Sequence, residues 1–111
     1  MILDDYVTVT GNGERASGRM KLRAEPTLCN QLNEVCEILQ QNSKLSLTLD
    51  CHSVDYISQQ SGSLLLRLLK TLRDEGYALM LTNVAQPTCD ILESMGIADL
   101  IPIVDDEDLP G

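Results

Sequence analysis

Short strand-like runs alternate with helical segments along almost the whole chain, and this alternation indicates an α/β fold. The strand-like runs alternate apolar and polar residues or are continuously apolar, whereas the helical segments repeat apolar residues every three or four positions. Strands that alternate with helices predict a mixed, partly parallel β-sheet with about three helices packed on it. The predicted strands span residues 6–10, 14–22, 45–50, 77–84 and 101–104, and the predicted helices span residues 26–41, 63–74 and 86–96.

An N-terminal hairpin is predicted to open this sheet. The Gly-Asn-Gly segment at 11–13 is a strong turn signal between the first two strand-like runs. In the second run, small or apolar residues alternate with Arg15, Arg19 and Lys21, so we expect a buried face and an outward basic stripe. The basic stripe is a secondary candidate for partner binding, and a solvated strand face is the simpler interpretation.

The segment at 63–74 is rich in leucine. At 3.6 residues per turn, four of these leucines form one face that we expect to pack on the sheet, namely Leu65, Leu68, Leu69 and Leu72. Leu64 and Leu66 flank this face and are either buried against neighbouring elements or exposed for a partner. Burial is favoured, although single exposed leucines are common in folded proteins.

Size and charge restrict the class of protein. The chain has 111 residues, 43% of them hydrophobic, which is enough for one core, so we predict a single domain over 1–111 with loosely ordered tails at 1–5 and 105–111. The net charge of −9 argues against nucleic acid and anionic membranes as partners. No apolar run is long enough for a bilayer and no secretory signal is recognisable, so we expect a cytoplasmic protein without direct membrane insertion.

The sequence carries no recognisable motif for catalysis, a metal or a cofactor. Its four cysteines lack the spacing of a zinc site, and glycine-rich phosphate loops and hydrolase signatures do not occur. The single histidine, His52, is interpreted as a solvated loop residue. We therefore expect no enzyme, no cofactor and no metal, and we favour a protein-binding or signalling module.

The sequence resembles the STAS domain, the fold of bacterial anti-sigma factor antagonists, over residues 6–104. The family pattern contains xVDFIDSSGLGxLLxLLK, whose apolar approach matches VDYI at 54–57 and whose helix matches LLLRLLK at 64–70. The upstream family segment is similar to SGRMKLRAEPTLCNQL at 17–32. The resemblance implies a STAS-like fold and a non-catalytic regulator that acts by binding another protein.

The family's regulatory motif differs in this chain. In the family, an anti-sigma factor with kinase activity phosphorylates the first serine of Asp-Ser-Ser-Gly, and only the unphosphorylated antagonist binds it. Aligned without gaps, this motif falls on Ser58 to Ser61 and places Gln59 at the phosphoacceptor position. Because Gln59 has no hydroxyl, the resemblance implies a neutral surface that docks constitutively. Ser58, one residue upstream, is expected to cap the helix, since serine is a common N-cap residue that accepts a hydrogen bond from a free N–H of the first turn. The alternative is that Ser58 or Ser61 is a displaced phosphoacceptor.

The resemblance also implies where a partner would dock. The docking surface would cover residues 58–63 and the start of the following helix. The implied partner is an anti-sigma factor/serine kinase of the histidine-kinase-like ATPase type, or a PP2C-type phosphatase. A STAS subunit of an ABC-type transport complex and a nucleotide- or lipid-sensing module are the alternatives. The predicted partner-binding residues are Ser58, Gln59, Gln60, Ser61, Gly62, Ser63, Leu64 and Arg67.

Overall fold

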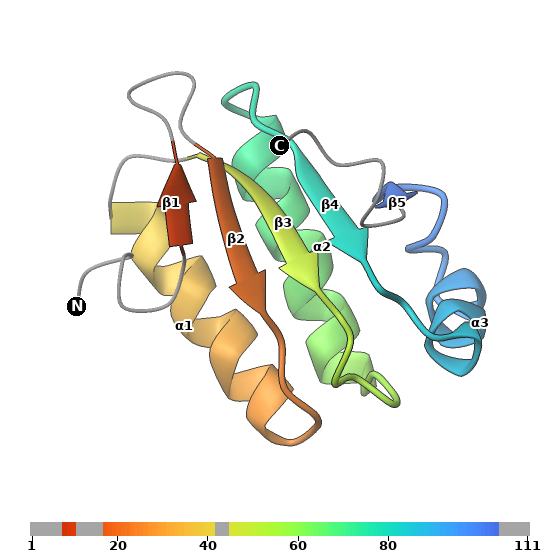
Figure 1. Ribbon diagram of the computed structural model, residues 1–111. Helices are drawn as coiled ribbons and strands as arrows, with labels where there is room; N and C mark the ends of the chain where they lie inside the picture. The colour runs from red at the N-terminus through yellow and green to blue at the C-terminus, as the bar shows by residue number, and fades with distance from the viewer. Residues whose placement is uncertain (1–7, 11–16, 42–44, 105–111) are drawn as a thin grey trace.

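The computed structural model describes residues 8–10, 17–41 and 45–104. These residues form one five-stranded β-sheet with the strand order β1-β2-β3-β4-β5 and three helices (Figure 1). The elements in chain order are β1 (Thr8–Thr10), β2 (Ser17–Lys21), α1 (Thr27–Gln41), β3 (Ser46–Asp50), α2 (Gln59–Arg73), β4 (Leu79–Thr82), α3 (Gln86–Ser94) and β5 (Ile103–Val104).

Most of the sheet is parallel. Strands β2, β3, β4 and β5 run parallel to one another, and β1 pairs antiparallel with β2. The predicted α/β class is therefore confirmed, and each parallel pair is joined through a helix, as parallel strands require. The predicted turn at 11–13, Arg15 and the two predicted tails lie outside the described residues.

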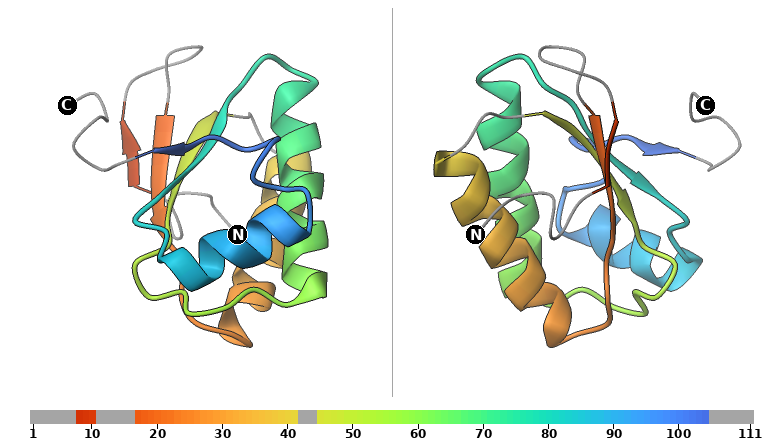
Figure 2. Two further views of the ribbon diagram at one scale, coloured as in Figure 1. Left: turned by 90° about the vertical axis from the view of Figure 1, so that its right-hand side faces the viewer. Right: turned by 60° about the vertical axis from the view of Figure 1, so that its left-hand side comes forward.

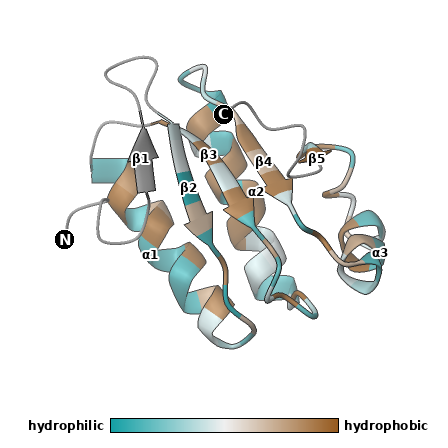
Figure 3. Cartoon of the chain, viewed as in Figure 1, coloured by the Kyte–Doolittle hydropathy of each residue, from teal (hydrophilic) through white to brown (hydrophobic). Residues whose placement is uncertain are grey.

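Helices α1 and α2 lie side by side on one face of the sheet (Figures 1 and 2). The strands turn alternate residues toward these helices, so that Met20, Leu47, Leu49, Leu79 and Leu81 are all buried. The four leucines predicted to form the inner face of α2 are buried as well, and the flanking leucines at 64 and 66 are half-buried. In Figure 3, β4 and the body of α2 are mostly apolar, whereas the N-terminal end of α2 is pale to teal.

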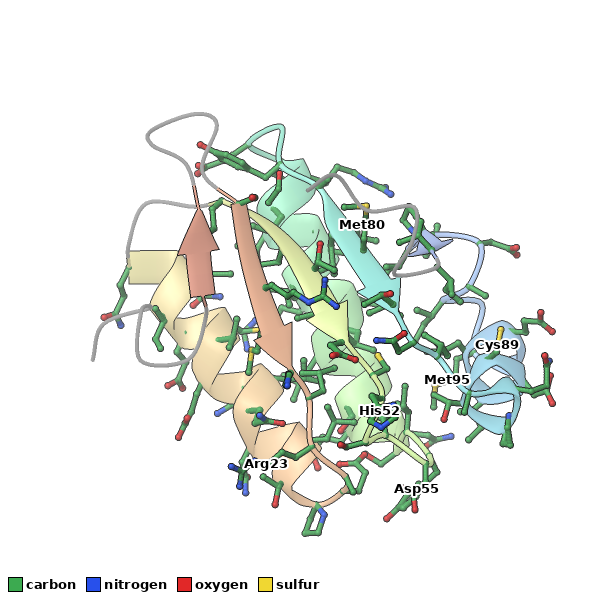
Figure 4. All side chains as sticks on the ribbon, in the orientation of Figure 1. Arg23, His52, Asp55, Met80, Cys89 and Met95 are labelled. Carbon is green, nitrogen blue, oxygen red and sulfur yellow. The ribbon has the colours of Figure 1, made fainter. Side chains whose placement is uncertain are left out.

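The opposite face of the sheet is more polar. Arg19, Thr48 and Met80 are neighbours in register across β2, β3 and β4, and all three are half-buried. The continuously apolar run at 77–84 predicts a strand that is covered on both faces. This prediction is wrong, because α1 and α2 pack on the same face and leave Met80 partly open (Figure 4). The strand is also shorter than predicted, since Asn83 adopts a φ of 57° and ends the extended backbone.

Helix α2 begins four residues earlier than the predicted start at Ser63. Ser58 has an extended backbone, and its Oγ accepts a hydrogen bond from the backbone N–H of Ser61 at 3.1 Å. This is an N-cap, which satisfies one of the free N–H groups at the helix start. The polar residues 59–62, which show no apolar periodicity, therefore form the first turn of the helix instead of a loop. Among the described residues, no helix has the length and apolar character needed to cross a bilayer.

Candidate functional site

The candidate site lies at the end of the sheet where α1 and α2 begin. The loops that follow β2 and β3 both emerge at this end, because the carboxyl ends of parallel strands share one edge (Figure 1). His52 and Asp55 mark the loop between β3 and α2 in Figure 4, and both are exposed. The loop ends at Ser58, the cap of α2. The sheet thereby places the first turn of α2 at the same end as the start of α1.

The predicted docking residues divide into exposed and buried groups. Ser61 and Gly62 are buried, and Ser58 and Leu64 are half-buried. The buried pair shapes the helix start but cannot offer side chains to a partner. We use the name entry surface for the remaining accessible set, which consists of Gln59, Gln60, Ser63 and Arg67, all exposed, with Ser58 and Leu64 at its edge.

The two serines proposed as displaced phosphoacceptors hold the helix start together. The Ser58 hydroxyl lies 3.2 Å from the Ser61 hydroxyl and also caps the Ser61 N–H. Ser61 is completely buried, at 0% exposure. A buried hydroxyl is out of reach of a kinase, so Ser61 is the weaker candidate of the two.

The residues that follow α3 pack closely against the first turn of α2. A Cβ atom added to Gly62 would lie 2.7 Å from Met95 Sδ and 3.3 Å from Ile97 Cδ1. Real Cβ atoms essentially never lie within 3.0 Å of another heavy atom, so a side chain at position 62 would require Met95 to shift. Met95, labelled in Figure 4, is half-buried beside the entry surface.

Sequence reasoning missed Glu25, which anchors the candidate site from a different part of the chain. Its Oε2 accepts a hydrogen bond from the Ser58 N–H at 2.7 Å, and its Oε1 accepts one from the Cys29 N–H at 3.2 Å. Partial burial by itself would raise the pKa of Glu25, but hydrogen bonds from Ser58, Ser61 and Cys29 outweigh it and lower the pKa below its usual value. One carboxylate thus holds the start of α1 and the residue that precedes α2.

A second missed cluster surrounds Asp50 at the end of β3. Asp50 is only 7% exposed, and its Oδ1 accepts hydrogen bonds at 3.0 Å from both Asn83 Nδ2 and the His52 N–H. Desolvation would raise the pKa of Asp50, but these hydrogen bonds and the nearby Arg19 guanidinium lower it. Arg19 Nη2 lies 4.0 Å from Asp50 Oδ2, so this member of the predicted basic stripe is directed to an internal partner. Lys21 is exposed.

Comparison with known proteins identifies the family. The sequence matches the STAS domain family over residues 15–109, and the chain therefore belongs to that family. This family is non-catalytic, in line with the expectation that the protein is not an enzyme. Among the described residues, no group of three or more His, Cys, Asp or Glu side chains is placed to hold a metal ion. A search of curated protein sequences gave no significant match.

Solved structures support the fold assignment. The unphosphorylated anti-sigma factor antagonist SpoIIAA has a TM-score of 0.66 at 10% identity, with 92% of this chain and 90% of that chain covered. A putative anti-sigma factor antagonist from Thermotoga maritima has a TM-score of 0.68 at 14% identity, covering 90% and 86%. An anti-sigma-factor antagonist (STAS) domain protein from Planctomyces limnophilus has a TM-score of 0.63 at 17% identity, covering 89% and 88%. At these identities the likeness shows a shared fold.

Proposed function

We propose that this STAS domain is an anti-sigma factor antagonist-like regulator that binds a protein partner through the entry surface. The proposed partner is an anti-sigma factor/serine kinase of the histidine-kinase-like ATPase type, or a PP2C-type phosphatase. The observation that carries the proposal is the exposure of Gln59 and Gln60 on the first turn of α2. The resemblance to the family motif implies that the phosphoacceptor position falls on this turn. Their amides offer a partner hydrogen bonds without charge.

The chemistry of this turn favours docking without a phosphate switch. Phosphorylation would add about 1.5 to 2 negative charges to such a surface, and Gln59 has no hydroxyl to accept the phosphate. The two hydroxyls within the aligned motif at 58–61 are engaged, since Ser61 is buried and the Ser58 Oγ caps the helix. The motif therefore stays unphosphorylated, which is the receptive form in relatives with an intact motif.

Phosphorylation by a partner kinase tests the missing switch. We expect the wild-type protein, incubated with a candidate kinase and ATP, to show no added mass, and the Gln59→Ser variant to gain one phosphate. Gln60→Ser is the matched control, because it places the same hydroxyl one residue further along the exposed turn. A phosphate mapped to Ser58 or Ser61 of the wild-type protein would contradict the proposal.

Binding of the same partner tests the docking surface. Gln59→Asp adds a negative charge to the first turn, where the helix dipole tolerates an acid, so the fold is retained. We expect the affinity for the partner to fall, while Gln40→Asp, an equal charge change on an exposed position of α1, leaves it unchanged. Equal affinity of the Gln59→Asp and wild-type proteins would refute docking at this turn. Capture of an ABC-type ATPase in place of an anti-sigma factor would redirect the proposal to a transport complex.

A further inference from the structure

The outer face of α2 differs in charge from the rest of the protein. The helix contains three of the eight basic residues of the chain and none of its seventeen acidic residues. The remaining sequence then holds five basic and seventeen acidic residues, a net charge of −12. We use the name cationic ridge for the three basic residues of α2, which are Arg67, Lys70 and Arg73, and all three are exposed.

The cationic ridge continues the entry surface along the same helix. Gln60, Ser63, Arg67 and Lys70 follow each other at intervals of three, four and three residues, which places them on one line along the helix. This line points away from the sheet, because the buried leucines occupy the opposite side of α2. In the left view of Figure 2, no described segment lies on the side of α2 that faces away from the sheet. A partner that contacts the first turn therefore meets the ridge next.

Among the described residues, the cations of the ridge form no salt bridge. Burial raises the pKa of the Cys36 thiol in α1, and the Arg67 guanidinium acts against this rise. The ion pair between Arg19 and Asp50 is the salt bridge found among the described residues, and no carboxylate there pairs with a ridge residue. Lys70 and Arg73 lie in the last turn, where cations stabilise the helix dipole. Arg67 lies before that turn, so the dipole does not account for it.

We infer that the cationic ridge binds an acidic segment of the partner protein and thereby sets the orientation in which the partner docks. The inference rests on the proposed function, because it describes the chemistry of the partner that meets the entry surface. A partner with an acidic contact segment is repelled by most of this acidic protein and attracted only to α2. Complementary charge combined with repulsion elsewhere is an effective source of orientation and specificity.

The geometry sets the size of this segment. Arg67 and Arg73 are six residues apart, which corresponds to about 9 Å along the helix axis. Two or three carboxylates on successive turns of a partner helix match this length. Nucleic acid fits less well, because its charges continue over a much longer distance and would approach the acidic remainder of the surface.

A defined probe tests the ridge without knowledge of the partner. The probe is a short synthetic helical peptide with Glu on successive turns of one face, and the same peptide with Gln serves as its control. We expect the Glu peptide to shift the backbone amide signals of residues 67–73 in an NMR titration, with weaker binding as salt is raised. The Gln peptide is expected to leave these signals unchanged. Shifts that are absent or scattered over the surface would overturn the inference.

Two double variants distinguish the effect of the ridge's own charge from the effect of the protein's net charge. Arg67→Gln/Lys70→Gln and Lys21→Gln/Arg23→Gln remove the same two charges, and all four side chains are exposed. We expect the ridge variant to lower the affinity for the Glu peptide about 2- to 30-fold, which corresponds to the loss of two exposed ion pairs. The control variant should change this affinity less than about twofold. Equal losses in both variants would overturn the inference. Binding of a DNA oligonucleotide to the ridge as tightly as the Glu peptide would also overturn the inference.

A comparison with the entry surface distinguishes the two proposals. The ridge variant for this comparison is Lys70→Gln/Arg73→Gln, because both residues are exposed and neither belongs to the entry surface. Once a partner is identified, a loss of binding in Gln59→Asp but not in this ridge variant refutes the ridge and leaves the proposed function standing. A loss in the ridge variant alone supports the ridge and refutes docking at the first turn. No loss in either variant refutes both, whatever the peptide shows.

Discussion

The carboxylate of Glu25 offers a direct test of how the candidate site is held in place. It accepts one hydrogen bond from the N–H of Ser58, just before α2, and another from the N–H of Cys29, in the first turn of α1. Glu25→Gln removes the charge and replaces one acceptor oxygen with an N–H donor. One of the two backbone N–H groups then faces a donor and loses its partner.

The expected loss follows from these two bonds. A hydrogen bond to a charged group contributes about 1.5–3 kcal/mol, but water can reach this half-buried carboxylate, so the lower value applies. We expect Glu25→Gln to lower the free energy of unfolding by about 1.5 kcal/mol at neutral pH, as measured by urea denaturation. Glu37→Gln is the matched control, because Glu37 is an exposed acid of α1. Its effect should stay within about 0.5 kcal/mol.

The pH dependence gives a second check on the same variant. The pKa of Glu25 is lowered in the folded protein from its ordinary value of 4.5, so the ionised carboxylate stabilises the fold above that pH. This stabilisation declines as the pH falls below 4.5 and is lost once the pH passes the lowered, folded-state pKa. The stability difference between wild type and Glu25→Gln should therefore shrink on acidification. A difference no larger than that of the control, or one that grows as the pH falls, would refute the role of Glu25.

Two further predictions concern the packing and charge around the site. Gly62→Ala should lower the free energy of unfolding by about 1 kcal/mol, because the added Cβ would lie 2.7 Å from Met95 Sδ. In a Met95→Ala background, the same change should become neutral or stabilising. An unchanged loss of stability in that background would refute the contact. Asp50→Asn should destabilise the protein by about 1–3 kcal/mol at neutral pH, because the carboxylate accepts bonds from the Asn83 side chain and the His52 N–H. Because the pKa of Asp50 is lowered, this loss of stability should decline as the pH falls below 3.8. Urea denaturation measures the loss, and a loss that does not change with pH would contradict the prediction.

The helices and strands could be predicted from the sequence where apolar residues repeat regularly. The leucines at 65, 68, 69 and 72 recur at helical spacing, and all of them are buried. The start of α2 has no apolar repeat, because residues 59–62 are polar or lack a side chain. It could be predicted only from Ser58, whose expected role as the helix cap is confirmed. There the helix depends on one capping hydroxyl, that of Ser58. Apolar periodicity carries no signal for such a cap, and a serine is equally common in loops.

The hydrogen bonds that hold the candidate site in place were harder to predict than the position of the site. An acid just before a predicted helix is a capping signal, and Glu25 does bond to the first turn of α1. Its second bond, to Ser58, joins residues 33 positions apart in the chain. The same holds for Asp50 and Asn83, whose separation is also 33. Such contacts arise only when the parallel strands bring their loops to one end of the sheet.

These hydrogen bonds also explain why the residue at position 59 can vary while the fold is kept. Ser58, Ser61 and Glu25 form the hydrogen bonds at the start of α2, and none of these bonds involves the side chain at position 59. The Gln59 side chain is exposed on the first turn. A hydroxyl at this position can therefore be lost without removing a bond that holds the helix. On the proposed function, the Gln at position 59 changes the regulation of the surface and leaves its shape intact.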